Sequence, residues 1–145
     1  MKKSILKITV ISLLTVSSGL LTTSCKKYDE GPAISFRSKK ARVVNKWKAE
    51  KVMENGKDVT SDYQGVTWEF KDDNKFYFNF LGILPITGKW EFNNDKSKII
   101  LTYDITNEKS ELEILRLKEK SMWLKLNDKD DNGNPVTTEI RLIPA

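Results

Sequence analysis

The sequence predicts an all-β protein, an eight-stranded antiparallel up-and-down barrel that follows an N-terminal signal peptide and a short linker. Three observations carry this prediction. Between Trp68 and Phe92, large aromatic residues alternate with polar ones, which is the period-two pattern of half-buried strands. Turn residues separate the apolar runs at short intervals, and such short connections force neighbouring strands to run antiparallel. No convincing helix is available to cover a face, so the strands bury their apolar sides best by closing on themselves.

Residues 1–24 are predicted to form a lipoprotein signal peptide. Lys2, Lys3 and Lys7 precede an apolar run at 8–21, which is shorter than the ~20 apolar residues that span a bilayer. These lysines are the only charges before Cys25, so removing them leaves 22 basic against 20 acidic residues. The basic character of the chain therefore belongs largely to the leader, and no nucleic-acid partner is expected.

Cys25 is the only cysteine, so it cannot form an internal disulfide. Residues 21–25, Leu-Thr-Thr-Ser-Cys, resemble the lipobox of bacterial lipoproteins, although Thr22 occupies the place that usually holds leucine. The resemblance implies cleavage before Cys25 and a covalent lipid on its thiol and amine. The mature protein is then expected to be exported and lipid-anchored to the bacterial outer membrane, on its periplasmic or its surface face.

Residues 25–42 are predicted to be a lipidated tether, because they are polar and show no sustained period. Arg37, Lys39, Lys40 and Arg42 could contact anionic headgroups. The alternative is a solvated approach to the first strand with one helical turn that begins after Ser38, and we favour this alternative.

Residues 43–145 have the length of one small domain. The connection at 57–65 contains a run from Thr60 to Tyr63 that could form one helical turn. The first strand opens at 44–49 and ends before Asn55-Gly56, a strong turn pair. The other seven predicted strands are 66–71, 75–80, 88–93, 98–104, 110–117, 122–127 and 136–143.

The segment 111–120 is ambiguous between helix and strand. Its composition favours a helix, and Leu112 with Leu115 fits helical spacing. Leu112 with Ile114, then Leu115 with Leu117, fits a strand whose phase changes at a β-bulge. The regular spacing of the surrounding strands favours the strand.

The segments 44–48, 70–75, 88–92 and 139–142 together resemble bacterial lipocalin-like lipoproteins. This resemblance implies a lipocalin-like barrel of eight strands with a small cup for apolar molecules. Lipocalins carry Gly-x-Trp near the first strand, with the tryptophan closing the base of the barrel. Here that place holds Asn45-Lys46-Trp47, which lacks the glycine. The Gly-x-Trp motif occurs instead in a later strand, as Gly88-x-Trp90.

The sequence carries little that could perform catalysis. It contains no histidine, which removes the commonest general base and nucleophile pair, and no glycine-rich phosphate loop. Most carboxylates lie in turns or alternate outward. We therefore expect no enzyme activity and no cofactor apart from the lipid on Cys25.

Residues 128–139 match the calcium-loop pattern of EF-hands, including the distal Glu139. Strand patterns flank this segment where an EF-hand needs helices, and Pro135 lies in its middle. A hairpin loop of turn-forming residues is the favoured interpretation. Asp128, Asp130 and Asn132 stay as weak calcium candidates.

The connection from Leu81 to Ile86 is almost wholly apolar. It forms either an apolar lip at the barrel mouth or a plug folded over the barrel end, and the plug is favoured. The alternating pattern predicts which side chains point into the barrel, and together they would fill most of its small interior. We call these residues the inward set: Trp47, Trp68, Phe70, Phe76, Phe78, Phe80, Trp90, Phe92, Leu101, Tyr103, Ile114, Leu124 and Leu126. The candidate ligand-binding residues at the barrel interior and mouth are Trp47, Trp68, Phe70, Phe78, Phe80, Ile83, Leu84, Trp90 and Tyr103.

Two functions fit these features. The first is an anchored binding protein that holds or carries a small apolar molecule at the bacterial cell envelope. The second is a structural or adaptor lipoprotein with a filled barrel that docks another envelope protein. Trp123 is predicted to point outward, opposite Met122 and Leu124, and an exposed indole there would suit the second function.

Overall fold

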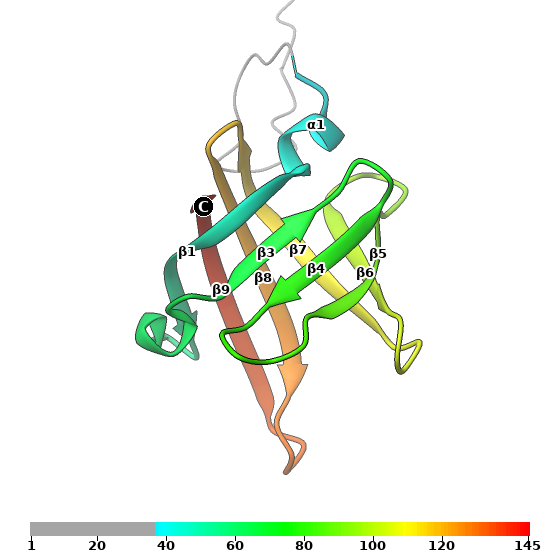
Figure 1. Ribbon diagram of the computed structural model, residues 1–145. Helices are drawn as coiled ribbons and strands as arrows, with labels where there is room; N and C mark the ends of the chain where they lie inside the picture. Colours follow the sequence, from blue (N-terminus) through cyan, green and yellow to red (C-terminus); the bar gives the residue numbers. More distant parts are fainter. Residues whose placement is uncertain (1–36) are drawn as a thin grey trace, which may run out of the picture.

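The computed structural model describes residues 37–145, so the signal peptide and Cys25 lie outside the described residues. The described chain forms one antiparallel sheet whose strands follow one another in sequence order (Figure 1). No helix within it is long and apolar enough to cross a membrane. The strands are β1 (Asn45–Glu54), β2 (Lys57–Asp58), β3 (Thr67–Phe70), β4 (Lys75–Asn79), β5 (Ile86–Phe92), β6 (Lys98–Tyr103), β7 (Lys109–Lys118), β8 (Ser121–Lys129) and β9 (Pro135–Pro144).

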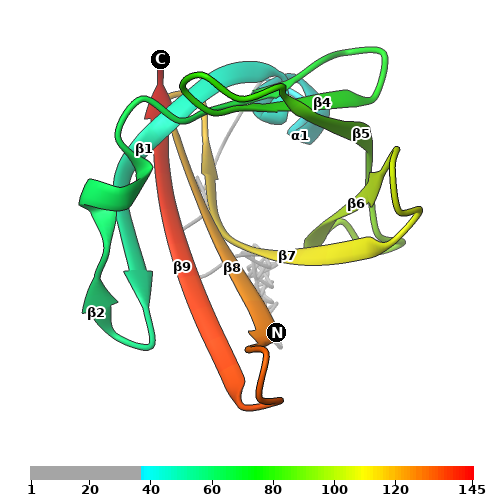
Figure 2. The ribbon, with the colours of Figure 1, turned by 60° about the horizontal axis from the view of Figure 1, so that its bottom comes forward.

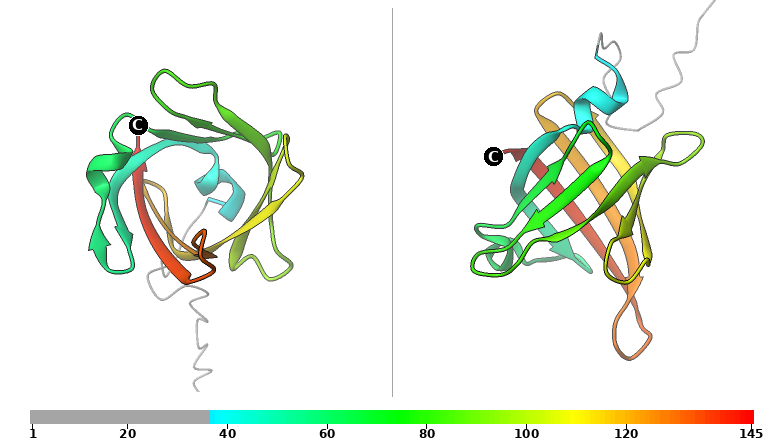
Figure 3. Two further views of the ribbon diagram at one scale, coloured as in Figure 1. Left: turned by 90° about the horizontal axis from the view of Figure 1, so that it is seen from below. Right: turned by 45° about the vertical axis from the view of Figure 1, so that its right-hand side comes forward.

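The sheet closes into a barrel through β1, which pairs with β3 on one side and with β9 on the other. The β1–β9 pairing runs from Trp47 opposite Pro144 to Glu54 opposite Thr138. Seen along its axis, the sheet forms a complete ring (Figure 3). The predicted eight-stranded up-and-down barrel is therefore confirmed, with the two-residue β2 as an additional strand on the end of β1.

One strand is additional to the sequence-based expectation, two strand limits differ from it by two residues, and the other limits agree to within one residue. Positive φ angles of 45° at Asn55 and 81° at Gly56 form a tight turn, which folds Lys57–Asp58 back onto β1 as β2. We predicted only a connection there. β5 begins at Ile86 rather than 88, and β8 continues to Lys129 rather than 127, because each has a partner strand at those positions.

The ambiguous segment at 111–120 is a strand, as predicted. It forms most of β7, and the register shifts between Ile114 and Arg116, so Leu115 is the bulged residue. The expected short helical turns are also present. They are α1 (Lys39–Val43) and the 3₁₀ helix η1 (Thr60–Tyr63).

Helix α1 covers one end of the barrel, which we call the closed end (Figures 1 and 3). The Ser38 hydroxyl oxygen accepts a hydrogen bond from the Ala41 amide at 3.1 Å and begins the helix. Arg42 is buried and donates to the Leu117 carbonyl of β7 at 2.7 Å. The indole N–H of Trp47 donates to the Val43 carbonyl at 2.9 Å. Trp47 thus joins α1 to β1 at the barrel base without the glycine of the family pattern.

The basic residues around α1 contact the barrel. Arg37 forms an ion pair with Glu119 at 2.7 Å, and Lys40 lies 3.5 Å from Asp72. Arg42 is buried, as described above. The helical turn that begins after Ser38 agrees with the favoured interpretation, but the segment packs on the barrel and is not solvated, because Arg42 and Val43 are buried.

The core lies inside the barrel, where alternate residues of each strand meet. All thirteen members of the inward set predicted from sequence belong to this core or pack against it. The alternation argument is therefore confirmed. The buried apolar residues that the inward set omitted are Val43, Val52, Val66, Ile99, Leu112, Leu117, Met122 and Leu142.

Candidate functional site

The closed half of the barrel is filled by aromatic rings. Phe70 and Trp90 meet edge to face with centroids 5.8 Å apart, and Trp90 meets Phe92 in the same way at 5.6 Å. Of the candidate ligand-binding residues, Trp47, Phe70 and Trp90 have at most 2% of their surface exposed. These three side chains form the floor beneath any cup.

The opposite end of the barrel, which we call the open end, is formed by four connections. They are the β1–β3 connection with β2 and η1, and the β4–β5, β6–β7 and β8–β9 loops (Figures 1 and 3). Near this end Tyr63 of η1 stacks on Trp68, with ring centroids 6.0 Å apart. Burial raises the pKa of the Tyr63 hydroxyl. Phe80 and Tyr103 are only partly buried and pack on the core from the same side. Tyr63 was not a candidate from the sequence, because a single tyrosine in a turn carries no pattern.

The β4–β5 loop is exposed, so the favoured plug hypothesis is wrong. Leu81, Ile83 and Leu84 have 78%, 69% and 88% of their surface exposed. Ile105 of the β6–β7 loop is 87% exposed, and a 2.7 Å hydrogen bond from the Thr87 hydroxyl to Asp104 joins the start of β5 to that loop. The plug fails because the aromatic rings already fill the space below the loop. In residues 37–145, the exposed large apolar side chains all lie at this end, and we call them the apolar lip: Leu81, Ile83, Leu84, Ile86 and Ile105.

The strands β7 and β8 diverge towards the open end (Figure 2). A cavity of about 590 Å³ lies where they separate. The pairing of these strands stops at Leu112 opposite Leu126. Beyond it, β7 continues along β6 and β8 continues along β9, which leaves a gap between them. Nothing in the sequence predicts this gap, because it depends on how far β7 and β8 stay paired with each other before each continues along another strand. We call it the β7–β8 wedge, and it is lined by Tyr103, Glu108, Lys109, Ser110, Glu111, Leu126, Asn127 and Asp128.

The open end is acidic. The loops 54–66, 104–108 and 128–134 together carry eight acidic and two basic residues, and the β4–β5 loop at 80–85 carries no charge. By contrast, residues 37–48 at the closed end carry six basic residues and no acidic one. The two ends therefore have opposite electrostatic character.

The β8–β9 loop is a hairpin between two strands, as the favoured interpretation expected. The Asp130 carboxylate accepts hydrogen bonds from the amides of Asn132 and Asn134 at 2.9 and 2.8 Å, and from the Asn134 side chain at 2.9 Å. These bonds lower the pKa of Asp130, with the Asn134 side chain as the largest cause. Glu139 is held in β9 opposite Lys125. Within residues 37–145 no group of three or more acidic residues is placed to hold a metal. Weak calcium binding by Asp128, Asp130 and Asn132 stays a prediction, which calorimetry with millimolar calcium would test.

Trp123 points outward from β8, as predicted, but it is not an exposed anchor. Its ring lies between the guanidinium groups of Arg116 and Arg141, at 4.2 and 4.3 Å from the centroid. The indole nitrogen is buried. The two arginines cover the surface on which a partner was expected to dock.

These features define a small antiparallel barrel with a filled, covered base and one open end bordered by apolar and acidic side chains. The chain belongs to the lipocalin-like domain family, whose model matches residues 43–124. This confirms the lipocalin-like part of the resemblance seen in the sequence. No curated protein matches the chain.

Among solved structures, the chain is similar to bovine odorant-binding protein in complex with a selenium-containing odorant. The identity is 10% and the TM-score 0.50, covering 77% of this chain and 76% of the other. A deswapped triple mutant of the bovine protein is 13% identical, with a TM-score of 0.47 over 72% of this chain and 74% of its own. The similarity to the odorant complex supports the lipocalin-like fold. Proteins of this family are typically binding proteins and not enzymes.

Proposed function

We propose that this chain is a lipid-anchored, lipocalin-like binding protein of the bacterial cell envelope, which holds or carries a small apolar molecule without changing it. The observation that carries the proposal is the position of the apolar lip. Five exposed large apolar side chains lie together at the one barrel end that α1 does not cover. Exposed apolar side chains gathered in one place usually mark a binding surface. The odorant held by the bovine structure of similar fold supports a small ligand.

The lower part of the barrel is filled, so the ligand is expected to lie at the mouth and not deep inside. Trp68, Phe78, Phe80 and Tyr103 are the candidate aromatic residues on that side, and Ile83 with Leu84 supply the lip. A ligand resting on these groups would contact apolar surface on several sides. It would leave the packed floor undisturbed.

The proposed anchor is consistent with the position of the tether. Arg37 lies at the closed end, where it pairs with Glu119 in the turn between β7 and β8. The eleven residues at 26–36 can span at most ~40 Å when fully extended. A lipid on Cys25 would thus hold the closed end near the membrane surface and leave the mouth free to face away from it.

Native mass spectrometry of the full chain, extracted from the membrane of its own host, tests the proposal. We expect a bound small molecule whose mass is released by organic solvent, and a lipid adduct that is lost in Cys25→Ser. A chain that carries the lipid adduct but neither a small molecule nor exchangeable apolar probes would contradict the binding function.

The exposed lip also favours the second candidate, an adaptor that docks another envelope protein. Replacing Ile83 and Leu84 together by serine is expected to change the free energy of unfolding by less than about 0.5 kcal/mol, because both side chains are exposed. Urea denaturation followed by circular dichroism measures this change, with buried Ile99→Ser as the contrasting variant. A sharp loss of stability would show that the lip completes the core.

The same double variant separates the two candidate functions. If the small bound mass disappears, the lip contacts a ligand. If a co-purified protein disappears instead, the lip is a docking surface, and the adaptor function replaces the proposed small-molecule binding function.

A further inference from the structure

We infer that the ligand of this barrel is an amphiphile with a positively charged end, and that the β7–β8 wedge receives that end. This inference rests on the proposed function and names the chemical class of its ligand. The wedge is a cavity and not merely a charged surface, since the two strands that border it have separated. Its volume of about 590 Å³ lies within the range of small-molecule sites.

The floor of the wedge is apolar and continuous with the core. Tyr103 and Leu126 are both partly buried and pack on the core cluster. The ring of Tyr103 meets Phe76 edge to face at 5.6 Å, which fixes its position at the boundary between floor and mouth. An apolar chain that rests on the lip can therefore continue onto this floor.

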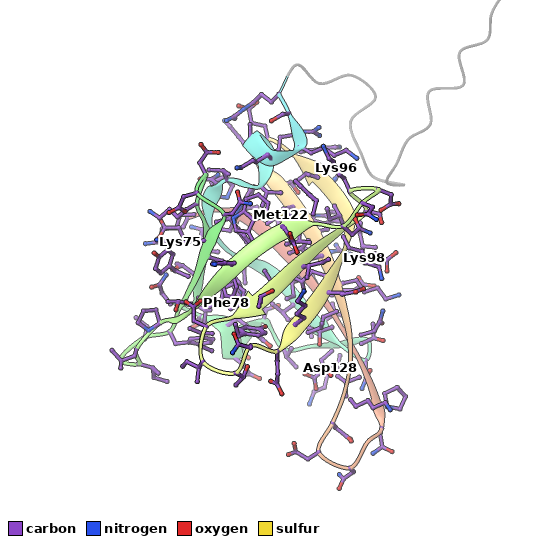
Figure 4. All side chains as sticks on the ribbon, turned by 90° about the vertical axis from the view of Figure 1, so that its right-hand side faces the viewer. Lys75, Phe78, Lys96, Lys98, Met122 and Asp128 are labelled. Carbon is purple, nitrogen blue, oxygen red and sulfur yellow. The ribbon has the colours of Figure 1, made fainter. Side chains whose placement is uncertain are left out.

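The charged groups that line the wedge are mainly negative, with Glu108, Glu111 and Asp128 against Lys109. Strand alternation places Ser110 on the same face as buried Leu112, and Asp128 on the same face as buried Leu124. Glu108 directly precedes β7, and its carbonyl accepts a hydrogen bond from the Tyr103 amide at 3.0 Å. Figure 4 shows Asp128 at the open end of β8, with Met122 of the same strand towards the closed end. Lys109 and Glu111 alternate with Ser110 and lie on the other face of β7, and Lys109 is the one basic residue of the lining.

The carboxylates of Glu108 and Asp128 are available to a ligand, although Asp128 also accepts a hydrogen bond from the Lys129 amide at 2.8 Å. Glu111 is engaged, because Lys98 donates to it at 2.6 Å. Neither Glu108 nor Asp128 forms an ion pair within residues 37–145. The acidic loops around the mouth add to the same negative potential, so a cationic ligand end is attracted and an anionic one is repelled.

The test uses three probes with the same octyl chain and different ends: octyltrimethylammonium, octanol and octyl sulfate. The mature acylated protein, which begins at Cys25 in the proposed processing, is titrated in phosphatidylcholine nanodiscs by calorimetry below the aggregation limit of each probe, with empty nanodiscs as reference. We expect octyltrimethylammonium to bind about tenfold more tightly than octyl sulfate, with octanol between them. Raising the salt concentration is expected to reduce this difference.

Glu108→Gln with Asp128→Asn is expected to weaken octyltrimethylammonium severalfold and to leave octanol binding unchanged. Asp72→Asn with Glu91→Gln removes the same charge from exposed positions elsewhere on the barrel and should alter neither. Equal binding of all three probes, or the same effect from both double variants, would overturn the charge preference and leave the apolar binding function standing. Absence of binding by every probe would overturn the proposed function itself.

Discussion

Trp47→Ala is expected to lower the free energy of unfolding by about 4 kcal/mol, which is a large part of the stability of a small domain. The Trp47 side chain has no exposed surface. It lies in β1 opposite Trp68 on one side and Pro144 on the other, at the seam that closes the barrel. Its removal would leave a cavity at the base and would break the hydrogen bond to the Val43 carbonyl that holds α1. Urea denaturation followed by far-ultraviolet circular dichroism measures the loss.

Two further variants separate the causes. Trp47→Phe keeps a ring and loses the N–H donor, so it should cost about 1–2 kcal/mol for the unsatisfied carbonyl. Trp123→Ala removes the same side chain from the outer face, where it packs between two guanidinium groups, and should cost clearly less than Trp47→Ala. Equal losses in Trp47→Ala and Trp123→Ala would show that Trp47 does not secure the closed end.

Most of the fold could be predicted because alternation and turn chemistry are local signals. The two-residue spacing of Phe76 and Phe78 predicts that both side chains point into the barrel, and the pair Asn55-Gly56 predicts a tight turn. Even the bulge at Leu115 is visible, since the apolar phase changes there. The strand β2 was missed because two exposed residues carry no periodic pattern, and only pairing to β1 defines them.

The candidate site was harder to predict because it depends on where strands end relative to one another. The β7–β8 wedge exists because the two strands keep different partners beyond Leu112 and Leu126, and no residue type encodes that separation. The exposure of Ile83 and Leu84 depends on whether space remains inside, and the packing of Phe70, Phe76 and Trp90 decides that it does not. Whether a loop is buried thus depends on the total volume of the side chains in the core. The sequence of the loop alone does not contain that information.

Gly88→Ala is expected to destabilise the barrel by about 3 kcal/mol, although it adds only one methyl group. Gly88 lies in the middle of β5, opposite Phe76 in β4 and Tyr103 in β6. A β-carbon at this position would collide with the Thr102 carbonyl oxygen and would come within 2.6 Å of the Phe76 ring. The carbonyl belongs to the adjacent strand and cannot move without loss of the β5–β6 pairing. Gly88 stands two residues before Trp90, so the Gly-x-Trp motif at this position reflects close packing in β5.

Gly133→Ala is the matched control for this effect. Gly133 has a φ of 82°, and no atom lies within 4 Å of an added β-carbon, so this substitution tests backbone strain without a collision. It should cost about 1 kcal/mol. The larger loss in Gly88→Ala, measured by the same denaturation, would then be due to the Thr102 and Phe76 contacts. Equal losses of unfolding free energy at the two positions would contradict this explanation. They would mean that β5 can shift away from the Phe76 ring to accommodate the added methyl group.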